Sequence, residues 1–144
     1  MGFLDSLLGS NGNSETDSGA DKTSNSFDVS MSFSPLRLSA ARASYVELLV
    51  KIKNVSSSST LVSLDASVQK TAMIGFDSAC ISKSVEKKAG ELAPNQSVEL
   101  KIPLWSNNQT KAGSYSLNLV VYSHYLNYNK VISTTKRSTS VRAV

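Results

Sequence analysis

The sequence predicts an all-β fold, and three observations support this prediction. Apolar and polar residues alternate with a period of two over several short segments, which is typical of strands with one buried face. Serine and threonine supply 28 and 8 of the 144 residues, and these side chains favour turns and solvent-facing strand positions over helix interiors. Polar loops separate the segments, and residues 27–144 show no clear helical periodicity. We therefore expect an antiparallel β-sandwich of about seven strands.

Five segments show the alternation most clearly, and turn-forming residues bound them. The segments cover residues 27–34, 45–53, 61–68, 98–105 and 115–122. Pro35 ends the first segment, and the serine-rich run 54–59 forms the loop after the second. Pro94 fixes φ at the start of the turn before the fourth segment. Pro103 has no N–H to donate, so the end of that strand lies at a sheet edge or a bulge.

The apolar residues of these segments form the predicted core. They are Phe27, Val29, Met31, Phe33, Val46, Leu48, Val50, Ile52, Val62, Leu64, Ala66, Val68, Val98, Leu100, Ile102, Leu104, Tyr115, Leu117, Leu119 and Val121. Burying each large apolar side chain contributes roughly 1.5–3 kcal/mol before the entropy of ordering is subtracted. This set is enough for one two-sheet core without disulfides.

Two further segments show a weaker pattern. Residues 71–91 contain few apolar anchors, and we expect an irregular stretch with a short strand near residues 79–85. Residues 129–144 form the last predicted strand. This strand is more polar than the others, so we expect it at a sheet edge.

The first 26 residues differ in character from the rest. Residues 10–26 contain no side chain larger and more apolar than alanine, and we expect them to form a flexible, disordered polar linker. Residues 1–26 carry four acidic side chains and one lysine. Residues 27–144, the predicted sandwich domain, carry 14 basic and 7 acidic side chains.

Residues 1–9 form a predicted short amphipathic peptide. The residues that fall on one face of a helix are Phe3, Leu4, Leu7 and Leu8. A helix this short is not stable alone in water, so it needs a protein groove or a membrane surface, or else it is a tail without a role. It lacks the basic start and cleavage pattern of a secretory signal. We therefore expect a cytoplasmic protein, or alternatively a peripheral membrane protein on the cytoplasmic side.

Two short motifs resemble those of immunoglobulin-like domains. Residues 92–100 read Leu-Ala-Pro-Asn-Gln-Ser-Val-Glu-Leu and resemble the Leu-Ala-Pro-Gly-x-Ser-x-x-Leu turn and strand of prokaryotic modules such as the cell-adhesion-related bacterial domain. Asn95 replaces the usual glycine. Residues 112–117 resemble the entry to strand F, where a tyrosine forms the tyrosine corner. The resemblance implies an immunoglobulin-like sandwich and gives Tyr115 a structural role, its hydroxyl bonding nearby backbone.

The sequence offers little for catalysis or metal binding. Cys80 is the single cysteine and His124 the single histidine, which excludes an internal disulfide and any site that needs two histidines. The carboxylates show no metal-binding spacing, and the seven glycines form no phosphate-binding loop. We expect no cofactor, no metal and no enzymatic activity.

The best candidate site in the domain is an aromatic hairpin. Tyrosines provide large contact area at low entropic cost, and three of them lie within seven residues. The candidate partner-binding residues are Trp105, Tyr122, His124, Tyr125 and Tyr128. The leading hypothesis is a non-enzymatic protein-binding or assembly module that uses this hairpin or an edge strand, and the partner is an unknown protein or a second copy.

Two other classes of function remain open. The first is a peripheral membrane adaptor anchored by the N-terminal peptide, although that peptide lacks the basic residues that draw peptides to anionic lipid. The second is a weak nucleic-acid-binding domain, in which outward lysines such as Lys51 and Lys101 contact phosphates. The basic excess is moderate and only four residues are arginine, so nucleic acid is the less favoured partner.

Overall fold

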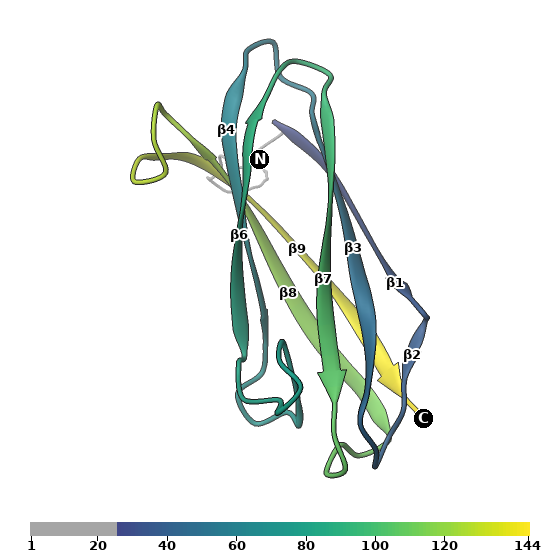
Figure 1. The fold of residues 1–144 in the computed structure, drawn as a ribbon. Helices are drawn as coiled ribbons and strands as arrows, with labels where there is room; N and C mark the ends of the chain where they lie inside the picture. The colour runs from purple at the N-terminus through teal and green to yellow at the C-terminus, as the bar shows by residue number, and fades with distance from the viewer. Residues whose placement is uncertain (1–25) are drawn as a thin grey trace, which may run out of the picture.

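The computed structural model describes residues 26–144, which form two β-sheets packed face to face (Figure 1). The four-stranded sheet has the order β1 (Phe27–Ser34), β3 (Ser44–Asn54), β7 (Ser97–Ser106) and β5 (Ile74–Gly75). The five-stranded sheet has the order β2 (Arg37–Leu38), β9 (Val131–Ala143), β8 (Gly113–His124), β4 (Thr60–Val68) and β6 (Ser84–Leu92). The described residues contain no helix. The predicted all-β sandwich is confirmed.

Nearly all neighbouring strands pair antiparallel. β3 lies at the centre of its sheet between β1 and β7, and β8 lies between β4 and β9. The one parallel pair joins Arg37 and Leu38 of β2 to the last residues of β9. The sheets thus combine strands that are consecutive in the chain, such as β8 and β9, with strands that are far apart in it, such as β3 and β7 or β4 and β8.

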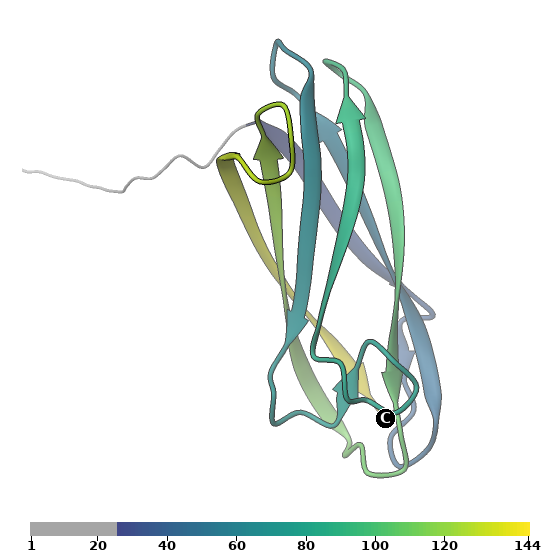
Figure 2. The ribbon, with the colours of Figure 1, turned by 60° about the vertical axis from the view of Figure 1, so that its left-hand side comes forward.

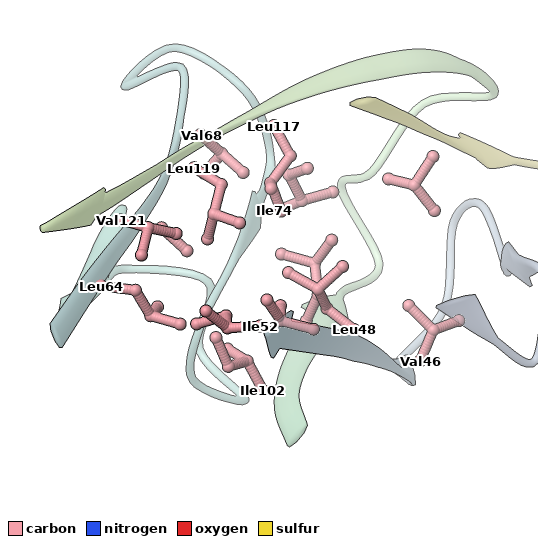
Figure 3. Close-up of a cluster of buried hydrophobic side chains, with 14 of the residues drawn as sticks. Val46, Leu48, Ile52, Leu64, Val68, Ile74, Ile102, Leu117, Leu119 and Val121 are labelled. Carbon is pink, nitrogen blue, oxygen red and sulfur yellow. The ribbon is translucent and has the colours of Figure 1, made fainter. Parts of the chain in front are cut away.

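The core lies between the two sheets, and the alternating pattern of the sequence produces it. Val46, Leu48, Val50 and Ile52 of β3 are fully buried, and so are Leu117, Leu119 and Val121 of β8. Figure 3 shows side chains of both sheets pointing toward one another in this layer. The inward side of each of the five clearly alternating segments is therefore the side that packs in the structure, and Val98 and Leu100 of β7 pack on the core while partly exposed.

Residues 71–91 differ from the expectation. The short strand expected near residues 79–85 is wrong, because a nine-residue strand, β6, runs over Ser84–Leu92 and pairs with β4. β6 is an edge strand, and most of its residues are exposed or half-buried, so its sequence carries no strong apolar alternation. The register also shifts opposite Val62 and Ser63, which breaks the period of two.

β9 pairs with β8 along almost its whole length and is the predicted last strand. On its other side, among residues 26–144, only Arg142 and Ala143 have a strand partner, in β2. The rest of that side is a free edge, in agreement with the polar composition. The hairpin that joins β8 to β9 projects from one end of the sandwich, and the start of β1 lies at the same end (Figure 2).

The predicted N-terminal peptide, residues 1–9, lies outside the described residues, and so does the predicted linker up to residue 25.

Candidate functional site

The aromatic residues of the predicted hairpin site separate into a packed group and an exposed group. Tyr122 and His124 end β8 on the outer side of the five-stranded sheet, away from the core. Tyr128 folds back from the hairpin so that its ring meets His124 edge to face, with centroids 5.1 Å apart. The rings of Tyr122 and His124 have centroids 6.1 Å apart. The His124 ring thus lies next to both tyrosine rings and connects the hairpin to the outer face of the sheet.

The Tyr128 hydroxyl fixes this arrangement to the neighbouring edge strand. It accepts a hydrogen bond of 3.1 Å from the backbone N–H of Gly90, at the register shift in β6. Gly90 has φ of 84°, a conformation that glycine adopts without a steric penalty. The Lys88 ammonium lies 5.0 Å from the centre of the Tyr128 ring, on the side open to solvent. The hairpin is therefore attached to β6 as well as to β8 and β9.

His124 makes one hydrogen bond within this group. Its Nε2 lies 2.7 Å from the Oγ of Ser63 on β4, and only 5% of the histidine is exposed. A serine and a histidine at this distance resemble a nucleophile and its base. Ser63 is, however, 2% exposed, and no residue that the structure describes bonds the Nδ1 of His124 to orient the ring for proton transfer. The contact between Ser63 and His124 therefore has a structural role and holds the imidazole ring beneath the hairpin.

Tyr125 is the one tyrosine of the hairpin that projects into solvent, with 57% of its surface exposed. Three apolar residues that the sequence analysis did not single out are exposed beside it along the same hairpin: Leu126, Val131 and Ile132. We call Tyr125, Leu126, Val131 and Ile132 the hairpin surface. In the sequence, this surface is indicated by two pairs of residues, Tyr125-Leu126 and Val131-Ile132, that flank the turn 127–130.

A pocket of about 680 Å³ opens beside the hairpin surface. Tyr125, Leu126 and Ile132 form one wall, and the serine-rich connection between β3 and β4 forms another. Ser26, at the start of the described chain, also lines this pocket. We call it the end pocket.

Two buried polar atoms of the end pocket have no hydrogen-bond partner within the described chain. They are the Nδ1 of His124 and the Oγ1 of Thr60, and both residues line the pocket. A buried polar atom without a partner costs about 1–3 kcal/mol. Both atoms are buried, so they are not part of the surface that the pocket opens to solvent.

Trp105 does not belong to this surface, and the grouping of Trp105 with the hairpin is wrong. It lies near the end of β7 in the other sheet, at the end of the sandwich opposite the hairpin (Figure 1). Its ring packs on Tyr45 with centroids 4.7 Å apart, because the two residues are direct cross-strand neighbours. Cross-strand aromatic pairing of this kind stabilises a sheet.

The remaining chemistry-bearing residues are structural in their contacts. Burial raises the pKa of the Cys80 thiol, and its Sγ donates a hydrogen bond of 3.3 Å to the Trp105 carbonyl. Burial also raises the pKa of the Tyr122 hydroxyl, and the charge of the nearby Asp65 carboxylate raises it further. Among residues 26–144, no three histidine, cysteine or acidic side chains lie close enough to share a metal ion. Over the same residues, no helix has the length and apolarity to cross a membrane.

The Tyr115 hydroxyl donates a hydrogen bond to the carbonyl of Lys111, four residues upstream and just before β8. A tyrosine corner makes the same contact at the entry to strand F. The structural role of Tyr115 remains a prediction, and its effect on stability is testable.

Comparison with solved structures identifies the fold. Two structures of the alpha-2-macroglobulin of Escherichia coli match residues covering 84% and 82% of this chain, with TM-scores of 0.56 and 0.54. The sequence identities are 13% and 14%, so the likeness concerns the fold alone. The matched regions are immunoglobulin-like sandwich domains. Residues 26–144 have an immunoglobulin-like fold.

This immunoglobulin-like chain spans only 7% and 16% of the two macroglobulin chains. A conjugative transposon lipoprotein from Bacteroides eggerthii is also similar over 82% of this chain, at 16% identity and a TM-score of 0.43. No protein-family model matches the sequence, and no curated protein matches it. The fold hosts many functions, so the function has to be argued from the surface.

Proposed function

We propose that this chain is a non-enzymatic protein-binding module whose contact site is the hairpin surface with the end pocket. The observation that carries this proposal is the exposure of four apolar or aromatic side chains on one hairpin, three of which line one pocket at an end of the sandwich. Single exposed apolar residues are ordinary on a soluble protein, but a contiguous group beside a pocket is typical of an interaction site.

The way in which the hairpin is held supports the proposal. His124, Tyr128 and Ser63 attach its base to the sheet, so Tyr125 and Leu126 stand on a supported loop. A supported aromatic side chain loses little entropy when a partner covers it, and such residues contribute much of the affinity of an interface.

The free edge of β9 extends the proposed contact. Val131 and Ile132 belong both to the hairpin surface and to the first residues of β9. Over these residues β9 has a strand partner on one side only. An extended segment of a partner can therefore pair with this edge while its side chains contact the hairpin surface.

The charges of the four-stranded sheet favour a protein partner over nucleic acid. Lys51 of β3 lies directly opposite Glu99 of β7, and Glu47 precedes it on the same strand. Phosphate binding depends on several cations acting together on one surface. Here acidic side chains are interspersed with the lysines, which weakens such a surface.

The test is affinity capture with the full chain as bait. The double variant Leu126→Ser, Ile132→Ser removes the apolar contacts without touching the core, and we expect it to lose at least about tenfold in captured partner because each buried side chain contributes about 1.5–3 kcal/mol. The control is the double variant Leu36→Ser, Ile81→Ser, since both residues are highly exposed elsewhere on the domain. A partner that is retained equally by both variants refutes the proposed surface.

A further inference from the structure

We infer that the apolar segment Phe3–Leu8 of the same chain occupies the end pocket and covers the hairpin surface. The inference rests on the proposed function, because it concerns the same surface. It makes the module self-masked: a partner has to displace a segment of the chain before it can bind.

The position at which the described chain begins is the first reason. Ser26 lines the end pocket, so the segment that precedes it enters at the pocket itself. The 16 residues between residues 9 and 26 are rich in serine, glycine and asparagine. An unstructured linker of this length has a mean end-to-end distance of about 20–25 Å. The apolar segment is therefore held within reach of the pocket at a high effective concentration.

The chemistry of the pocket is the second reason. Its wall offers Leu126, 77% exposed, and Ile132, 61% exposed, to an apolar ligand. Phe3, Leu4, Leu7 and Leu8 are the only strongly apolar residues of the first 26, apart from Met1. The segment thus supplies apolar side chains of the kind that can cover this wall.

Charge adds a smaller contribution. Residues 1–26 carry four acidic side chains and one lysine, whereas residues 27–144 have an excess of basic side chains. The charged residue that lines the pocket is Glu91, so this attraction comes from the basic excess of the whole domain and not from the pocket. It weakens with salt.

The experiment places a photo-cross-linking phenylalanine derivative at position 7 of the full chain. We expect irradiation to join position 7 to residues 125–132 of the same molecule, which peptide mapping identifies. The product is monomeric and its yield does not change on dilution. A dimeric product that disappears on dilution overturns the inference, because it assigns the pocket to a second copy. Products that map elsewhere on the domain also overturn it.

Two variants sharpen the result. Leu126→Ser, Ile132→Ser should lose most of the cross-linked product, whereas Leu36→Ser, Ile81→Ser should keep it. Far-UV circular dichroism verifies that both variants are folded. Equal yields in the two variants overturn the inference.

Partner capture separates this inference from the proposed function. If the segment masks the surface, Phe3→Ser, Leu7→Ser should raise partner capture several-fold, and unchanged capture overturns the masking. The cross-link needs no external partner, so it forms even if the proposed partner-binding function is wrong. Conversely, capture without any cross-link at the hairpin leaves the proposed function intact and refutes the masking.

Discussion

Tyr115 shows how one hydroxyl can fix the start of a strand. Its hydrogen bond to the Lys111 carbonyl joins β8 to the loop before it. We expect Tyr115→Phe to lower the free energy of unfolding by about 1 kcal/mol, because one hydrogen bond is lost and the ring is kept. Urea denaturation measures the difference. Tyr125→Phe is the control, since the Tyr125 side chain is exposed, and equal stabilities of the two variants contradict a structural corner.

Tyr122 connects stability to pH at the residue scale. Burial and the Asp65 carboxylate raise its pKa above the ordinary value of 10.0 in the folded state. As the pH rises, the Tyr122 hydroxyl therefore loses its proton in the unfolded chain before it does so in the folded chain. The stability that the protonated hydroxyl gives is fully present below the unfolded pKa and is lost as the pH rises through the folded pKa. We expect Tyr122→Phe to reduce the loss of stability in alkaline solution. The test measures the urea midpoint of unfolding of the variant and the wild type below and above pH 10. If the midpoint falls by the same amount with pH in both proteins, the prediction is contradicted.

At the scale of an element, Lys83 organises β5 and the two connections that flank it. Its Nζ donates hydrogen bonds to the carbonyls of Ala72, Ile74 and Cys80, at 2.6, 2.7 and 2.8 Å. The ammonium thereby satisfies one backbone acceptor before β5, one in β5 and one after it. This contact explains why a stretch with few apolar residues holds one conformation.

We expect Lys83→Met to destabilise the chain by about 1.5–3 kcal/mol, the range for hydrogen bonds to a charged group. Amide hydrogen exchange should accelerate first in residues 72–82. Lys70→Met is the matched control, because Lys70 is exposed on the neighbouring turn. Unchanged exchange in the loop would show that the apolar contacts of Ile74 alone hold it.

At the scale of the whole molecule, the two sheets share one core, and their stabilities should be coupled. Leu64 of β4 is fully buried in the five-stranded sheet, whereas Trp105 reports on the four-stranded sheet. We expect Leu64→Ala to cost about 2–5 kcal/mol. The transition seen by Trp105 fluorescence should shift together with the one seen by far-UV circular dichroism. A fluorescence transition that stays in place means that the sheets unfold separately.

The strands and the core follow from the sequence because they depend on a local period. Val46 to Ile52 and Leu117 to Val121 alternate with polar residues, and one buried face is the only arrangement that covers them. β6 was not predictable in the same way. It lies at an edge with a register shift, so its residues carry no such period.

The sequence by itself determined the immunoglobulin-like sandwich, its inward residues and the position of an aromatic hairpin. Only the tertiary structure decided which hairpin residues are free to bind. Tyr128 folds over His124, and His124 bonds Ser63, 61 residues away, so these side chains are covered, whereas Leu126 and Ile132 are left exposed. The physical reason is that alternation assigns a residue to one face of a sheet. What covers the outer face depends on contacts between segments far apart in the chain.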